Sequence, residues 1–116
     1  MANTFKIKTN DAMPTSAGTP LTLYTVPGST TTIVLGLMLC NIDTSQRLVD
    51  VHIESDTSDT EPNSNVHAIK DAPIPAGSTL EVMAGNKVVL QATDVLKIDC
   101  DVAAKIDATL SIMEIT

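Results

Sequence analysis

The sequence is poor in aromatic and basic residues. Phe5 and Tyr24 are its only Phe, Tyr or Trp residues, and seven Lys and Arg stand against fourteen Asp and Glu, for a net charge of -7. Surfaces that stack sugars or bases rely on aromatic rings, and phosphate backbones are bound by clustered Lys and Arg. We therefore expect no nucleic-acid partner and no sugar-stacking platform.

Long hydrophobic segments are also absent. The longest apolar run, residues 33–40, is too short to cross a bilayer as a helix, and the N-terminus has no apolar stretch of signal-peptide length. We expect no membrane partner and synthesis in the cytosol. A disulfide across a sandwich could join Cys40 and Cys100, but without a secretory context we expect two reduced thiols.

Motifs that carry chemistry are missing too. There is no G-x-S-x-G turn for a serine nucleophile, and the five glycines are dispersed rather than gathered in a phosphate-binding loop. His52 falls on the polar face of an expected strand and His67 beside a polar loop, neither in zinc-ligand spacing. We expect no enzyme: no catalytic residue, no cofactor and no metal centre.

Two clusters of acidic side chains, one in a loop and one near the turn at residues 103–105, are interpreted as exposed charges in contact with water. The loop at residues 55–65 has no hydrophobic side chain except proline and should be the most mobile part of the chain; whether it binds a cation or a receptor stays open. The second group would share an outward face if the strands around the turn at residues 103–105 paired as a hairpin. The acids are Asp56, Asp59 and Glu61 in the loop, and Asp99, Asp101 and Asp107 in the second group.

The residues that are abundant predict an all-β fold. Thr, Val and Ile account for 36 of 116 residues, and branched side chains favour strands. Several segments alternate apolar and polar residues, as half-buried strands do. We expect a single antiparallel β-sandwich, jelly-roll or immunoglobulin-like, in which residues 1–19 form an N-terminal strand and arm and residues 20–116 the body. The eight or nine expected strands cover residues 4–8, 20–26, 31–42, 47–54, 66–70, 78–84, 87–91, 95–102 and 105–115.

Turn residues divide these strands. Gly85-Asn86 has the composition of a two-residue hairpin loop between residues 80–84 and 87–90. The two prolines within residues 73–77 require an extended segment, and Gly77 then favours a turn. Residues 10–19 should form an exposed early connection.

The segment at residues 33–40 is apolar on both faces. Ideal alternation puts Ile33, Leu35, Leu37 and Leu39 on one face and Val34, Gly36, Met38 and Cys40 on the other. A two-layer sandwich covers only one face of a strand. We therefore predict that Val34, Gly36, Met38 and Cys40 face a partner, with cover by residues 10–19 or by the N-terminal strand as the alternative.

Several segments resemble small virion proteins of marine tailed phages, especially cyanophages. They are residues 24–27 (YTVP), 31–41 (TTIVLGLMLCN), 72–81 (APIPAGSTLE), 86–91 (NKVVLQ), 94–98 (DVLKI) and 107–115 (DATLSIMEI). The resemblance covers residues 20–115. It departs at Thr93, where such proteins usually carry Gly before the Asp, which puts the turn type there in doubt.

The resemblance implies a structural role in a virion assembled in the host cytoplasm. The small, acidic, β-rich chain suits a capsid decoration or cement protein that binds the major capsid protein or neighbouring virion proteins, and itself as a homo-oligomer. The alternative role is that of a tail, neck or baseplate component. A host-surface binding module is a third and less favoured role. Residues 4–8 could add a strand to a neighbour.

Overall fold

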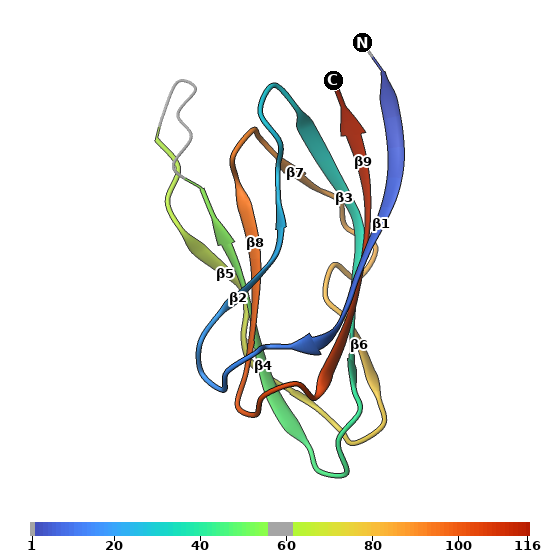
Figure 1. Ribbon diagram of the computed structural model, residues 1–116, viewed down its shortest axis with the longest axis vertical. Helices are drawn as coiled ribbons and strands as arrows, with labels where there is room; N and C mark the ends of the chain where they lie inside the picture. Colours follow the sequence, from blue (N-terminus) through green and yellow to red (C-terminus); the bar gives the residue numbers. More distant parts are fainter. Residues whose placement is uncertain (1, 56–61) are drawn as a thin grey trace.

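The chain folds into two antiparallel sheets that pack face to face (Figure 1). The computed structural model describes residues 2–55 and 62–116, which form nine strands and no helix. They are β1 (Asn3–Met13), β2 (Leu21–Thr25), β3 (Thr31–Asn41), β4 (Arg47–Glu54), β5 (Val66–Ile74), β6 (Thr79–Glu81), β7 (Val88–Leu90), β8 (Val95–Cys100) and β9 (Ile106–Ile115). The all-β antiparallel sandwich predicted from the sequence is confirmed.

The two sheets have different strand orders. The five-stranded sheet has the order β1-β9-β3-β6, with β7 also paired to β3, and the four-stranded sheet has the order β2-β8-β4-β5. Alternate residues of β9 fill the core, since Ile106, Ala108, Leu110 and Ile112 are buried while Asp107, Thr109 and Ser111 are half-buried. Period-two alternation thus places one face of the strand inside the sandwich.

The expected hairpin between residues 95–102 and 105–115 is wrong. β8 pairs with β2 and β4, whereas β9 pairs with β1 and β3, so the turn at residues 103–105 carries the chain from one sheet to the other. Asp99 therefore belongs to the four-stranded sheet, and Asp107 to the five-stranded sheet. These acids do not share one outward face.

The hairpin predicted around Gly85-Asn86 is also wrong. β6 pairs with Met38–Cys40 and β7 with Thr32–Val34, both antiparallel to β3. The chain thus follows the same edge of β3 twice, and residues 82–87 form an excursion between the two pairings. The excursion lies opposite an irregularity in β3, where the register shifts between Val34 and Gly36.

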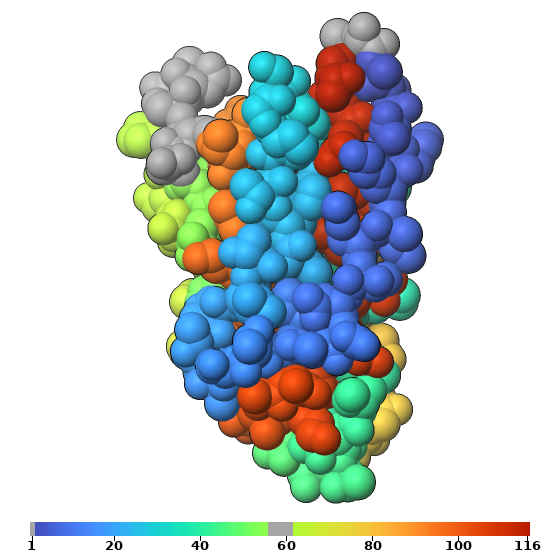
Figure 2. Space-filling view, in the orientation of Figure 1, coloured from blue at the N-terminus to red at the C-terminus, as the bar shows by residue number. Residues whose placement is uncertain are grey.

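β1 is longer than the expected strand and continues through residues 10–13. It pairs with β9 of its own chain from Asn3 to Met13, so residues 4–8 are already part of a sheet. The ends of the chain meet, because the Ala2 and Thr116 backbones exchange hydrogen bonds of 3.0 and 3.1 Å. Figure 2 shows β1 and the end of β9 together along one side of the molecule.

The other turns agree with the sequence. The segment at residues 73–77 ends β5 and turns at Gly77, whose φ is +71°. The connection at residues 91–94 is closed by a 3.0 Å hydrogen bond from the Asp94 backbone NH to the Gln91 carbonyl, with Thr93 at φ +73°. The mobility expected of residues 55–65 concerns mainly residues 56–61, which lie outside the described residues.

Candidate functional sites

An apolar surface covers much of the outer face of the five-stranded sheet. Directly opposed residues in a sheet point to the same face, and one such row runs across four strands from Phe5 through Met113 and Ile33 to Val89. Phe5 is 72% exposed and Val89 61% exposed. The outer apolar face, as we name it, consists of Phe5, Ile7, Ile33, Leu35, Met38, Val89, Met113 and Ile115.

A bulge in β3 determines which of its side chains belong to this face. Val34 is opposite Ile112 and Gly36 is opposite Ser111, so Leu35 is an extra residue on β3. An extra residue reverses the alternation beyond it. Thr32 and Val34 therefore face the core before the bulge, and Leu37 and Leu39 face it after the bulge.

The predicted partner-facing set is corrected accordingly. Val34 is fully buried in the core and does not lie on the outer face, while Ile33 and Leu35, which ideal alternation assigns to the core, are only half-buried and lie outside the core cluster. Met38 and Cys40 lie on the outer face as predicted, and Met38 is 44% exposed. Their contact with a partner stays a prediction.

Gly36 also lies on the outer face, beneath a side chain of its own chain. A Cβ built at Gly36 would lie 3.6 Å from Oε1 of Glu81. The same oxygen accepts a hydrogen bond of 3.3 Å from the Leu37 backbone NH. Glu81 thus binds a backbone NH on the edge of β3 that faces β6 and the excursion at residues 82–87.

The alternative that this chain covers its own outer face is not supported at Met38. β1 lies at the edge of the same sheet, beyond β9, rather than over it. Residues 14–20 lie at the other sheet, where the Gly18 backbone NH donates to the Cys100 carbonyl at 3.0 Å. Neither candidate segment buries Met38.

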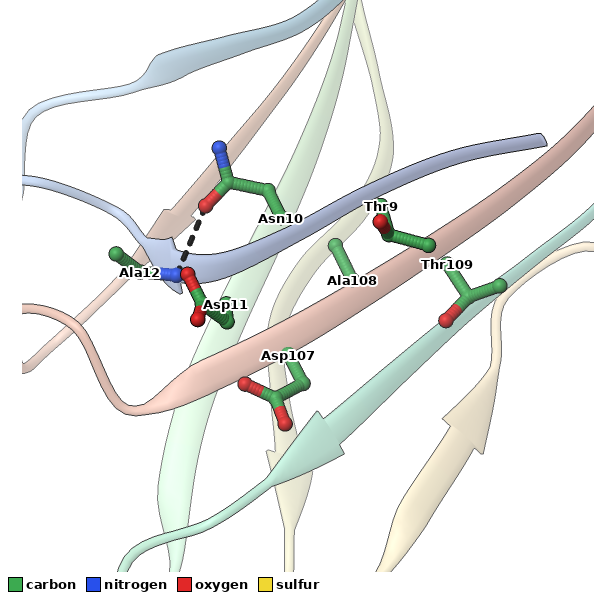
Figure 3. Close-up of a pocket in the computed structure, with 7 residues that line it drawn as sticks. All are labelled: Thr9, Asn10, Asp11, Ala12, Asp107, Ala108 and Thr109. Carbon is green, nitrogen blue, oxygen red and sulfur yellow. Dashed lines mark hydrogen bonds between the residues drawn. The ribbon is translucent and has the colours of Figure 1, made fainter.

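An open hollow lies at one end of this sheet, where β1 bends (Figure 3). It has a volume of about 630 Å³ and is lined by residues 9–12 and 107–109. The Ala12 backbone NH donates to Oδ1 of Asn10 at 2.8 Å, which holds the bend. Asp107 contributes a buried Oδ1 with no hydrogen-bond partner in the part of the chain described. The lining contains carboxylates, hydroxyls and an amide, and no Lys, Arg or His side chain.

The outer face of the four-stranded sheet is polar and gathers metal-ligand side chains. Asp50 and Asp99 are directly opposed on β4 and β8, and His52 lies two residues along β4 on the same face. The ligand atoms of these three residues all lie within 4.8 Å of one another. His67 of β5 is opposed to His52, with the ring centroids 4.3 Å apart. The isolated histidines expected from the sequence therefore lie side by side.

A polar network joins the two sheets inside the sandwich. The hydroxyl of Tyr24 on β2 donates to Oε2 of Glu114 on β9 and lies 2.8 Å from Oγ1 of Thr32 on β3. Oε1 of Glu114 forms a 2.8 Å ion pair with Lys6 of β1. Hydrogen bonds from Lys6 and Tyr24 lower the pKa of the Glu114 carboxyl, and burial together with the bond to Glu114 raises the pKa of Tyr24 to about 12.

Both cysteines are free thiols, as the sequence predicts. Cys100 is 3% exposed in the core, and burial raises the pKa of its thiol. Cys40 is half-buried on the outer face of β3. The two thiols therefore occupy different environments, which makes Cys40 a chemical probe of that face.

Neither a scan against protein-family models nor a search of curated proteins finds a match for this sequence.

No helix long and apolar enough to cross a membrane occurs in residues 2–55 and 62–116.

Proposed function

We propose that this chain is a non-enzymatic structural subunit that joins a larger assembly through its outer apolar face. The observation that carries the proposal is the gathering of Phe5, Ile7, Met38 and Val89 on that face. They are four of the seven large hydrophobic side chains that are exposed in the described residues. Contiguous exposed apolar surface is typical of a protein–protein contact.

The size of the sheet face limits the interface that it can form. Strands β1, β9 and β3 together span about 14 Å and the eleven residues of β3 extend about 36 Å, while β6 and β7 add three residues each, so the whole sheet face covers about 600 Å². A standard interface buries about 800 Å² on each partner. Covering one large apolar side chain contributes about 1.5–3 kcal/mol.

Charge divides the face into two regions. The rows that hold Phe5 and Ile7 contain no charged residue: the first is Phe5, Met113, Ile33 and Val89, and the second is Ile7, Ser111 and Gly36. The acids Glu81 and Asp107 lie opposite Met38 and Cys40, and the Glu81 carboxylate reaches over Gly36 at the border of the second row. The region around Phe5, Ile33 and Val89 therefore lacks charged side chains, while Met38 lies beside the acidic end.

The assembly we propose is a phage virion, with the capsid shell as the partner. This part of the proposal is supported by the resemblance of residues 20–115 to small virion proteins, together with the acidic charge that disfavours nucleic acid. A capsid decoration protein is present in numbers comparable with the major capsid protein. A tail, neck or baseplate component, the second candidate, is present in far fewer copies.

Particles lacking the protein test both parts of the proposal. They would be mixed with the unmodified chain, with Ile7→Lys or with Val66→Lys, and the bound protein compared with the major capsid protein on a stained gel. Ile7 is 64% exposed on the proposed face, and the matched control Val66 is 52% exposed on β5 of the other sheet. We expect Ile7→Lys alone to reduce binding by at least about tenfold, the equivalent of about 1.4 kcal/mol. Equal binding of the two variants would refute the docking face, and saturation at a few copies would refute the capsid position.

A further inference from the structure

We propose that Asp50, His52 and Asp99 bind a divalent transition-metal ion of the zinc class on the outer face of the four-stranded sheet. This inference is independent of the proposed structural role, because it concerns the opposite side of the sandwich. It also departs from the expectation, drawn from the sequence, that the chain has no metal centre.

Strand pairing brings the three side chains together. Asp50 and His52 are two residues apart on β4 and so point to the same face. The register of β4 with β8 puts Asp99 directly opposite Asp50. The ligand atoms, within 4.8 Å of one another, need to approach to about 3.3–3.6 Å to share a tetrahedral ion with bonds of about 2.0–2.2 Å. Side-chain rotation can supply this small adjustment.

The charge balance at this position favours a cation. Like charges directly opposed in a sheet are destabilising, and Asp99 is only 8% exposed. Lys97 lies directly opposite His52, and its ammonium group is 3.1 Å from Glu54, while Lys70 is 3.5 Å from Asp71. A divalent ion would offset the repulsion between the two carboxylates.

Hydrogen bonds hold the carboxylates in place. Oδ1 of Asp99 accepts a 2.7 Å hydrogen bond from the Cys100 backbone NH. Oδ1 of Asp50 accepts one from the backbone NH of Asp71, a residue with φ +50° at a bulge in β5. Second-shell bonds of this kind orient the ligands of metal sites. The second oxygen of each carboxylate has no hydrogen bond from another described residue.

His52 adds an independent observation. Its Nε2 is buried and has no hydrogen-bond partner in the described part of the chain. A buried polar atom without a partner is costly, and a ligand is one way to satisfy an imidazole nitrogen. His67 packs against the ring of His52 and limits its movement.

The donor set indicates the class of ion. One imidazole and two carboxylates suit Zn²⁺, whereas Ca²⁺ and Mg²⁺ prefer sites composed of oxygen ligands alone. A hollow lined by Asp50, Asp71, Asp99 and Asp101 lies beside the cluster. It gives the ion a path from solvent and leaves room for a water ligand.

Calorimetric titration of the chelator-treated full chain with zinc chloride tests the assignment. We expect one zinc ion per chain, and affinity reduced at least about tenfold in His52→Ala and in Asp99→Asn. Asp101→Asn is the matched control, because its carboxylate lines the same hollow but is not in the cluster; its affinity should change by less than about threefold. Cobalt(II) absorption bands would report the ligand set directly, and His52→Ala should change them.

Thermal unfolding separates a metal ligand from a merely structural residue. Without metal, Asp99→Asn should be at least as stable as the unmodified chain, because it removes carboxylate repulsion; with zinc, only the unmodified chain and Asp101→Asn should be stabilised. Absence of saturable zinc binding, or equal binding by His52→Ala and the unmodified chain, would overturn the proposal. Loss of binding in His67→Ala but not in His52→Ala would also overturn it, since the imidazole ligand would then lie on β5.

Discussion

Replacing Tyr24 by phenylalanine tests the polar link between the sheets. The change keeps the ring, which is 5% exposed in the core, and removes the hydroxyl that contacts Glu114 and Thr32. A hydrogen bond to a charged group contributes about 1.5–3 kcal/mol. We expect Tyr24→Phe to lower the free energy of unfolding by about 2 kcal/mol at pH 8, measured by urea denaturation followed by circular dichroism.

The effect depends on pH in a direction that the structure fixes. The pKa of Tyr24 is about 12 in the folded chain and 10.0 as its ordinary value, so the stability that Tyr24 contributes is complete below pH 10 and is lost as the pH rises toward 12. The loss reaches about 2 kcal/mol at pH 12. The difference between the unmodified chain and Tyr24→Phe should therefore shrink to near zero across this range.

Two controls make the result decisive. Thr22→Val removes a hydroxyl at an exposed position of the same strand. It should change the free energy of unfolding by less than about 0.5 kcal/mol. Combining Tyr24→Phe with Glu114→Gln gives a double-mutant cycle, whose coupling should exceed about 0.5 kcal/mol. If the stability difference stayed constant from pH 8 to pH 12, or the coupling were zero, the stabilising bond between Tyr24 and Glu114 would be refuted.

Three further predictions concern β3, β9 and one turn. Val34→Ala, in the core, should cost about 2 kcal/mol in urea denaturation, whereas Met38→Ala, 44% exposed, should cost less than half of that; equal costs would contradict the bulge in β3. Because the pKa of Glu114 is lowered in the folded chain, its contribution is present above the ordinary glutamate pKa and is lost as the pH falls through the folded value. Acid denaturation should thus be less steep in Glu114→Gln, and an unchanged slope would count against this. Thr93→Gly should raise stability by about 0.5 kcal/mol, because it relieves a β-branched residue at φ +73°; Thr22→Gly, within a strand, should lower it.

The sequence allowed the positions of the nine strands to be predicted, because several of them alternate, although β1 and β5 are longer than predicted and β6 is shorter. Residues 47–54 were predicted as a strand with the bounds that the structure shows. The β3 register was not predicted, because periodicity assumes an uninterrupted strand. Gly36 within the strand was the available signal, since glycine inside a strand often marks a bulge.

The pairing of the strands was predicted less well than their positions. The turn compositions at residues 85–86 and 103–105 predict local hairpins, but β6, β7, β8 and β9 pair with distant strands instead. Local turn chemistry cannot reveal which sheet the following strand joins. The Asp50–His52–Asp99 cluster depends on that register, so only the spacing of Asp50 and His52 on one strand face was visible in the sequence.

Alkylation of Cys40 tests most directly whether the outer face of β3 is covered in the assembly. The thiol of Cys40 lies on the outer face of β3, and the buried Cys100 serves as an internal control in the same molecule. Rates would be measured by mass spectrometry for the isolated chain and for the chain bound to purified particles. We predict that Cys40 reacts at least about tenfold more slowly in the particles, as expected for a side chain that loses solvent access, while Cys100 reacts slowly in both. Equal rates for Cys40 in the two states would contradict the prediction that Met38 and Cys40, on the outer face of β3, contact a partner.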